Sequence, residues 1–149
     1  MLQGSIGSEG ELYLSGQVYL PDLHFAEEIS FLVDTGADST CLGYEYLVAA
    51  GIDLQSLDGF TPCTLRGVGG SAAGVEVPGL LVFVGGDQEF RYPITVTIAL
   101  PQPKNAGDDE DIPIGALLGL DILRHWYMTC DWAKGVLTFD APPQVQRVP

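Results

Sequence analysis

The chain has 149 residues, 46% of them hydrophobic, and its 20 acidic residues outnumber 6 basic ones, giving a formal net charge of −14. This length and hydrophobic content exclude a disordered chain and predict one domain with its own core over residues 1–149. The negative charge repels polyanions, so nucleic acid and anionic membrane surfaces are poor candidates for partners.

Neither membrane spans nor metal-binding spacings are visible in the sequence. No apolar run approaches the ~20 residues that cross a bilayer, and the N-terminal residues lack the features of a secretory signal, so we expect a soluble, cytoplasmic protein. The three cysteines, Cys41, Cys63 and Cys130, show neither CxxC nor CxxH spacing. We therefore expect no disulfide framework and no zinc site, and nothing supports a nucleophilic pair with His24 or His125.

The first third of the chain predicts two strands and a helix. Residues 11–20 alternate between apolar and polar, as in a strand, with Gly16 as a possible bend or bulge. Residues 28–34 become continuously apolar, which is typical of a strand buried on both faces. Residues 44–52 form the first helical pattern, and Gly51 is its expected C-terminal stop.

The middle of the chain is rich in strand patterns. Residues 61–86 predict strands interrupted by glycine turns, and residues 88–100 predict one long strand. Residues 101–113 then break the rhythm with three prolines and the acidic cluster Asp108–Asp111. This segment lacks the alternating oxygen ligands of a calcium loop, so we expect a solvated acidic loop.

The last third of the chain returns to short elements. Residues 114–120 predict a buried strand, and residues 121–127 a short helix with Asp121 near its N-terminus, where an acid is favoured. Residues 128–140 predict a hairpin that turns near Ala133–Gly135, and the proline-rich residues 141–149 predict an irregular tail. Together these patterns predict an all-β domain with one or two short helices.

The stretch FLVDTGADST, residues 31–40, places a carboxylate directly after three apolar residues. A carboxylate at the end of a buried strand lies in a partly dry environment, which raises its pKa unless donors surround it. The Thr35 hydroxyl and the Gly36 N–H are such donors, and Gly36 permits turns that are closed to residues with a Cβ. Asp34 is therefore a candidate for chemistry, although the same tripeptide is also a common structural turn.

This stretch resembles the hydrophobic-hydrophobic-Asp-Thr-Gly-Ala signature of aspartic proteases, and in particular their single-domain, retropepsin-like branch. Two more segments follow in the family's order. RGVGGSAAGVEV (66–77) lies where the family has its glycine-rich flap hairpin, and ALLGLDIL (116–123) is similar to the downstream strand-glycine-helix motif. The resemblance covers roughly residues 12–139, is closer to cellular and bacterial members than to viral ones, and implies a retropepsin-like barrel.

The resemblance assigns roles to individual residues. Asp34 matches the catalytic aspartate, and Thr35 matches the threonine whose hydroxyl braces the equivalent loop of the partner subunit. Gly36 completes the active-site loop. The positions that it implies for substrate binding, the last three of them in the flap, are Gly36, Ala37, Asp38, Val68, Gly69 and Gly70.

One position departs from the viral pattern. Viral members follow the downstream glycine with an arginine that pairs with the acid corresponding to Asp38, and this chain has Leu120 there. Asp38 therefore pairs with another residue, for which Arg124 and Arg66 are candidates, or is simply exposed.

The number of catalytic groups implies a homodimer. The family mechanism needs two carboxylates that share a proton, and this chain has one Asp-Thr-Gly and no second Asp-Thr-Gly or Asp-Ser-Gly. A monomer would hold half a site, so we expect a C2 homodimer with Asp34 of each subunit near the two-fold axis. The expected activity is hydrolysis of a peptide or protein substrate without cofactor or metal.

Two alternatives stay open. The same fold could serve as a dimerisation or peptide-binding module with little proteolysis, because an intact Asp-Thr-Gly makes chemistry possible without requiring it. A metal-dependent hydrolase that uses Asp34, Asp38 and the acidic loop is a third reading, but the sequence lacks histidine ligands at useful spacing.

Overall fold

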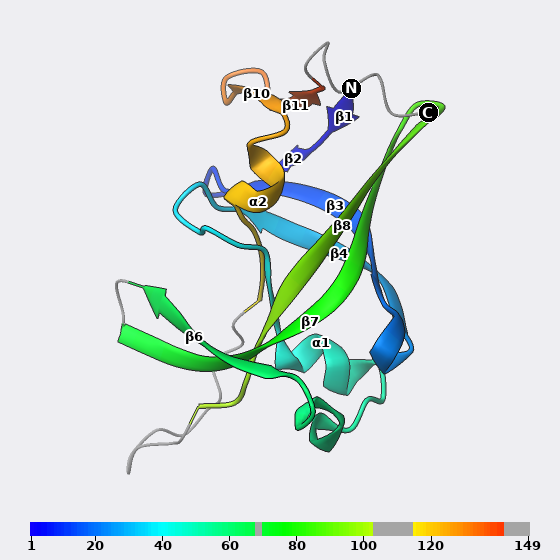
Figure 1. The fold of residues 1–149 in the computed structure, drawn as a ribbon. Helices are drawn as coiled ribbons and strands as arrows, with labels where there is room; N and C mark the ends of the chain where they lie inside the picture. Colours follow the sequence, from blue (N-terminus) through cyan, green and yellow to red (C-terminus); the bar gives the residue numbers. More distant parts are fainter. Residues whose placement is uncertain (68–69, 103–114, 142–149) are drawn as a thin grey trace.

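The computed structural model describes residues 1–67, 70–102 and 115–141. Most of these residues lie in strands, which form a barrel and a smaller sheet beside it (Figure 1). The predicted all-β class with one or two short helices is confirmed. Within the described residues, no helix is long and apolar enough to cross a membrane. The elements are β1 (Leu2–Gln3), β2 (Ser5–Ile6), β3 (Leu12–Leu20), η1 (Pro21–Leu23), β4 (Phe25–Val33), β5 (Cys41–Gly43), α1 (Tyr44–Ala49), η2 (Leu54–Leu57), β6 (Thr61–Gly67), β7 (Gly70–Gly85), β8 (Gln88–Ala99), β9 (Ala116–Leu118), α2 (Leu120–Leu123), β10 (Tyr127–Asp131) and β11 (Val136–Asp140).

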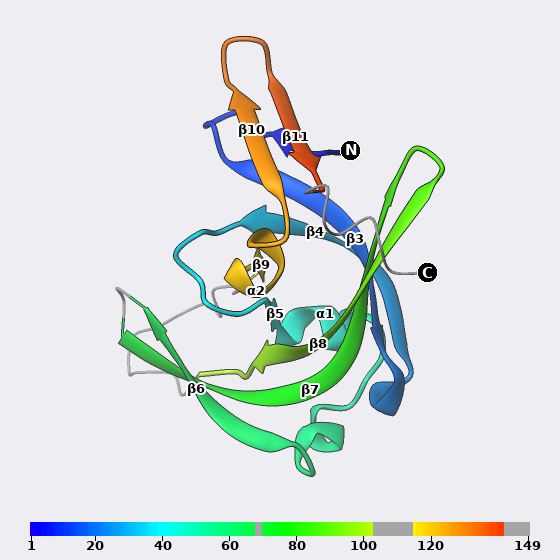
Figure 2. The same cartoon turned by 45° about the horizontal axis from the view of Figure 1, so that its top comes forward.

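Six strands close the barrel in the order β3-β4-β9-β5-β8-β7, because β7 pairs back with β3 (Figure 2). The pairs β4–β9 and β5–β8 are parallel, and the other pairs are antiparallel. Strand β9 lies between β4 and β5, so it separates the end of β4 from the start of β5. The loop that joins β4 to β5 is therefore held at the end of β9.

The barrel interior is filled by alternate residues of each strand, as the period of two requires. On β4, Ile29 and Phe31 are buried, whereas Glu28 and Ser30 are exposed. The prediction that residues 28–34 are buried on both faces is wrong, because the outer face of this part of β4 meets solvent. The largest fully buried side chains are Phe31, Phe83, Phe139, Leu2, Leu20, Leu42, Leu47, Leu81, Ile98, Leu118, Ile122 and Leu137.

Gly16 lies where the barrel closes, and the prediction of a bend or bulge there is wrong. Its pairing with Ile29 is in regular register with the rest of β3 and β4. A Cβ at this position would lie 2.8 Å from Cε1 of Phe83 on β7. Gly16 is therefore a site of close approach between β3 and β7.

Strand β7 runs unbroken through its internal glycines, so the predicted glycine interruptions within residues 70–85 are wrong. Gly79 pairs regularly with Ile94, and a Cβ there would lie 2.8 Å from the carbonyl oxygen of Tyr19. Close packing against β3 explains this glycine. By contrast, Gly51 ends α1 as predicted, with a φ of +80° that favours glycine.

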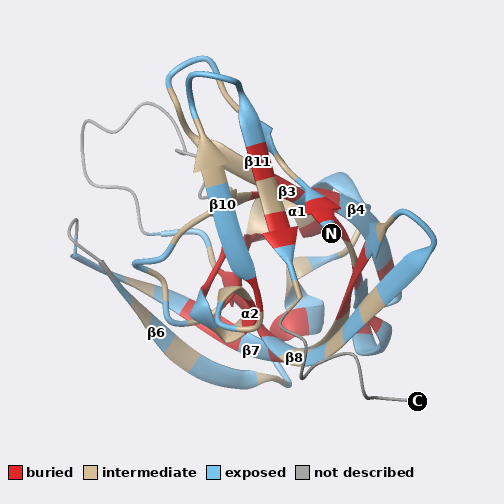
Figure 3. Ribbon diagram, turned by 90° about the horizontal axis from the view of Figure 1, so that it is seen from above, coloured by how far each residue is buried: buried red, intermediate tan, exposed pale blue. Residues whose placement is uncertain are grey.

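The smaller sheet has the order β1-β11-β10. The predicted C-terminal hairpin is confirmed, because β10 and β11 pair antiparallel from Tyr127↔Asp140 to Asp131↔Val136. Among the described strands, β10 pairs with β11 alone and has a free outer edge, and Figure 3 shows it largely exposed. Most of the predicted acidic loop at 101–113 and of the irregular tail at 141–149 lies outside the described residues.

Candidate active site

Asp34 is the first residue after β4, where the strand runs parallel to β9. The register pairs Val33 with Leu118, and the backbone N–H of Asp34 donates a hydrogen bond of 3.1 Å to the carbonyl oxygen of Leu118. Asp34 is partly buried, whereas Thr35 and Gly36 are exposed. The barrel therefore fixes the backbone of Asp34 while its side chain remains accessible.

The loop after Asp34 folds back onto its carboxylate. The N–H of Gly36 donates to Oδ1 of Asp34 at 2.9 Å, and the N–H of Ala37 donates to the carbonyl oxygen of Asp34 at 3.2 Å. A Cβ on Gly36 would lie 3.2 Å from the same Oδ1, which is tighter than ordinary contact. Glycine thus lets the amide approach the carboxylate and hold it in place.

The N-terminal end of α2 holds the rest of this loop. The N–H of Leu120 donates to the carbonyl oxygen of Ala37 at 2.8 Å, and the N–H of Asp121 donates to the carbonyl oxygen of Asp38 at 3.2 Å. A Cβ on Gly119 would lie 2.5 Å from the backbone carbon of Ser39. The downstream strand-glycine-helix segment therefore packs directly on the Asp-Thr-Gly loop.

Thr40 and Asp121 form the strongest side-chain link between these two segments. The backbone N–H of Thr40 donates to Oδ2 of Asp121 at 2.9 Å, and its hydroxyl donates to Oδ1 at 2.8 Å. The same hydroxyl accepts a hydrogen bond of 3.2 Å from the N–H of Gly119. Thr40 is fully buried, so these bonds satisfy polar groups that water cannot reach.

The sequence alone assigned no role to Thr40 and treated Asp121 only as a favourable acid at a helix N-terminus. Asp121 interrupts the apolar run of residues 116–123, and a polar residue in such a run signals a buried hydrogen bond, whereas Thr40 follows Asp38 and Ser39 and carries no such signal. Their 81-residue separation hides the partnership, because no local pattern relates positions so far apart.

Asp38 is exposed, and among the residues that the structure describes it makes no ion pair. Of the sequence alternatives, pairing with Arg124 or Arg66 is wrong within this part of the chain, and the exposed carboxylate is the one observed. Leu120, at the place of the viral arginine, is 39% exposed. Asp38 is therefore anchored through its backbone carbonyl.

The β6–β7 hairpin occupies the place predicted for the flap. Its arms pair down to Gly67↔Gly70, and Gly70 has a φ of +118°, which L side chains rarely adopt. A Cβ on Gly70 would meet nothing within 4 Å, so backbone conformation alone calls for glycine. The substrate-binding predictions for Val68 and Gly69 fall outside the described residues.

Two of the cysteine thiols and the metal-ligating side chains bear on the other chemistries that the sequence left open. Burial raises the pKa of Cys41 from its ordinary 9.0 to about 11, and burial followed by the nearby Glu76 raises that of Cys63. Both thiols stay protonated near neutral pH and are poor nucleophiles. No group of three or more histidine, cysteine or acidic side chains in this part of the chain could hold a metal ion.

Comparison with known proteins identifies the fold. No protein-family model and no curated protein matches the sequence. Among solved structures, a retropepsin-like aspartic protease from Rickettsia conorii is similar, with a TM-score of 0.56 and 22% identity over 91% of this chain and 95% of that chain. The chain therefore has the retropepsin-like fold that the sequence predicted.

Proposed function

We propose, from the retropepsin-like fold and the position of Asp34 within it, that the chain is an aspartic endopeptidase. It would act as a homodimer and hydrolyse peptide bonds through a water activated by two Asp34 carboxylates, one from each subunit. The observation that carries the proposal is the partly buried Asp34, whose backbone is fixed at the β4–β9 end and whose Oδ1 accepts from Gly36.

The chemistry follows from placing two such carboxylates together. Like charges about 3 Å apart do not both ionise easily, so the pair holds one proton and titrates in two separated steps. The ionised Asp34 removes a proton from the water as it attacks the peptide carbonyl. The protonated Asp34 gives its proton to the developing oxyanion, and the roles reverse as the amine leaves. No covalent intermediate forms.

The flap would hold the substrate over this pair. An extended peptide can add as a strand beside the β6–β7 hairpin, with its side chains alternating between pockets. Closure of residues 68–70 would exclude water and bring backbone donors to the peptide. Gly36, Ala37 and Asp38 would contact the substrate backbone from the opposite side.

The free edge of β10 supports dimerisation. No other strand of the described residues pairs with its outer edge, and Tyr127 is 63% and Met128 41% exposed. An exposed apolar edge strand is a template for pairing with another chain. In Figure 2, β10, the loop after β4 and the β6–β7 hairpin face the same side of the molecule. A second copy docked along this side would complete the site and cover the edge.

Cleavage of reduced, carboxymethylated casein tests the proposal. We expect the purified chain to cleave it in EDTA, with inhibition by pepstatin, and we expect Asp34→Asn to abolish cleavage while the variant remains folded. Asp87→Asn, in the exposed β7–β8 turn, is the matched control and should retain full activity. Equal cleavage by Asp34→Asn and the wild type would contradict the proposal.

The same assay separates the peptide-binding alternative. A binding module would capture casein-derived peptides yet release none of them shortened at any pH from 4 to 7. Activity that EDTA removes would instead favour the metal-dependent reading.

A further inference from the structure

Within the described residues, one edge of strand β8 is unpaired over part of its length, and we call the space beside residues 91–95 on this edge the lane. Strand β5 pairs with β8 only over Thr97–Ala99. The residues before β5 belong to the active-site loop and do not continue this pairing along β8. On its other edge, β8 pairs with β7 over its whole length. In the part of the chain that the structure describes, no strand pairs with the β5-side edge of residues 91–95.

The backbone of Thr95 faces this lane. The N–H of Thr97 donates to the carbonyl oxygen of Thr40, so Thr97 points toward the β5 side, and alternate residues point the same way. Thr95 and position 93 therefore share this direction. Residue 93 is proline, which lacks an N–H and is confined in sheets to edges. Thr95 thus presents a donor and an acceptor to the lane.

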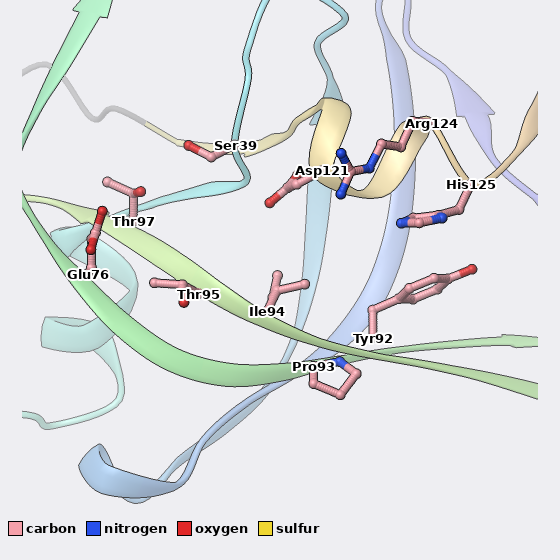
Figure 4. Close-up of a pocket in the computed structure, with 10 residues that line it drawn as sticks. All are labelled: Ser39, Glu76, Tyr92, Pro93, Ile94, Thr95, Thr97, Asp121, Arg124 and His125. Carbon is pink, nitrogen blue, oxygen red and sulfur yellow. The ribbon is translucent and has the colours of Figure 1, made fainter.

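The lane is a cavity of about 430 Å³ between β8 and α2, a size within the range of about 300–1,000 Å³ for ligand sites (Figure 4). Ser39, Thr97 and Glu76 lie at one end of it, toward the active-site loop. At the other end, Arg124 and His125 come from the end of α2, and His125 stacks on Tyr92 with ring centroids 5.5 Å apart.

Two acids and one arginine line the cavity. Glu76 lies at the end near Ser39 and Thr97, away from Arg124. Asp121 also lines it, and both its carboxylate oxygens accept hydrogen bonds from Thr40. Arg124 is the one permanent cation among the ten lining residues, and it is an exposed residue. A guanidinium forms two parallel hydrogen bonds with a carboxylate, and these are strong when both groups are charged.

We propose that this cavity is an exosite, which binds an extended segment of the polypeptide substrate outside the cleaved region. The segment pairs with the β8 edge at Thr95 and places an acidic side chain on Arg124. Ser39, which lines the cavity, directly follows Asp38 of the active-site loop. A substrate that passes Asp38 would therefore enter the cavity next. The proposal rests on the proposed function, since it names a substrate segment.

Three peptides built on a casein site that the enzyme cleaves test the exosite. A ten-residue core peptide is compared with versions extended by six residues that carry either aspartates or lysines. We expect KM for the aspartate peptide to be about tenfold below that of the core, the effect of one charge-assisted hydrogen-bonded pair. Arg124→Glu should remove this gain and leave the core peptide unchanged. Arg91→Glu, an equal charge change on β8 but outside the cavity lining, should keep it.

Direct binding separates the exosite from catalysis. Fluorescence anisotropy of the labelled aspartate extension with the Asp34→Asn variant should show binding that Arg124→Glu weakens about tenfold. This result supports the exosite even if the chain cleaves nothing. Thr95→Pro, which removes the edge N–H, should weaken binding, whereas Thr95→Val should not.

Three results would overturn the exosite. Equal binding of the aspartate extension by Arg124→Glu and Arg91→Glu would show that no specific carboxylate site exists at Arg124. Loss of core-peptide cleavage in Arg124→Glu would place Arg124 in the support of the active-site loop. A change of oligomeric state in Thr95→Pro or Arg124→Glu would make the lane an interface between copies.

Discussion

Asp121→Ala would cut the side-chain link that holds the Asp-Thr-Gly loop on α2. Asp121 accepts from both the N–H and the hydroxyl of Thr40, which is fully buried. A buried N–H left unpaired costs about 1–3 kcal/mol, and a hydrogen bond to a charged group contributes about 1.5–3 kcal/mol. We therefore expect the free energy of unfolding to fall by about 3 kcal/mol.

The proteolytic activity of Asp121→Ala should fall together with its stability. The loop between Asp34 and Thr40 would lose its side-chain attachment to α2 and keep only the backbone bonds from Leu120 and Asp121. A displacement of about 1 Å at a catalytic group costs on the order of a hundredfold in rate. Urea unfolding followed by tryptophan fluorescence, at one protein concentration for all variants, measures the stability. Cleavage of the core peptide measures kcat/KM.

A double-mutant cycle shows whether the effect belongs to this pair. Thr40→Val removes the hydroxyl at similar volume, and its combination with Asp121→Ala should reveal a coupling energy of about 0.5–3 kcal/mol. Glu27→Ala, an exposed acid on β4, is the control and should stay within about 0.5 kcal/mol of wild type. Additive effects of the two changes, or a loss in Asp121→Ala no larger than in the control, would refute the reasoning.

Three further predictions concern the barrel, a buried thiol and the dimer edge. Gly16→Ala should lower the free energy of unfolding by about 1–3 kcal/mol, because its Cβ would press on Phe83, whereas Gly59→Ala has nothing within 4 Å and should be nearly neutral in the same urea assay. Alkylation of Cys41 by iodoacetamide should be slow at pH 8 and speed up as pH approaches its pKa of about 11, and fast labelling at pH 8 in the folded protein would contradict the burial. Tyr127→Lys should shift the chain from dimer to monomer in sedimentation velocity and abolish cleavage, whereas Val84→Lys, equally exposed on the far hairpin, should do neither.

The sequence predicted the elements whose signals are local. The alternation over 11–20, the helix that stops at Gly51 and the C-terminal hairpin each depend on neighbouring residues, and each is confirmed. The order of the three family-like segments was likewise enough to predict the retropepsin-like fold.

The errors arose where distant strands meet. Gly16 and Gly79 look like breaks in their own strands, but each is required by a strand far away in the sequence, across the β3–β7 closure. Thr40 and Asp121 likewise pair across 81 residues of sequence, so neither residue's neighbours reveal its partner. Local patterns record which face of a strand is apolar, and they do not record which strand will cover it.

Mixing wild-type chain with Asp34→Asn chain tests the shared site most directly. The wild-type concentration is held constant, the variant is added, and cleavage of the core peptide is followed after the subunits have exchanged. A site built from two Asp34 residues predicts that activity falls to about one half at equal amounts and to about one tenth at a ninefold excess, because a mixed dimer has one carboxylate. Activity that stays constant at every ratio would contradict the account, since each chain would then hold a complete site.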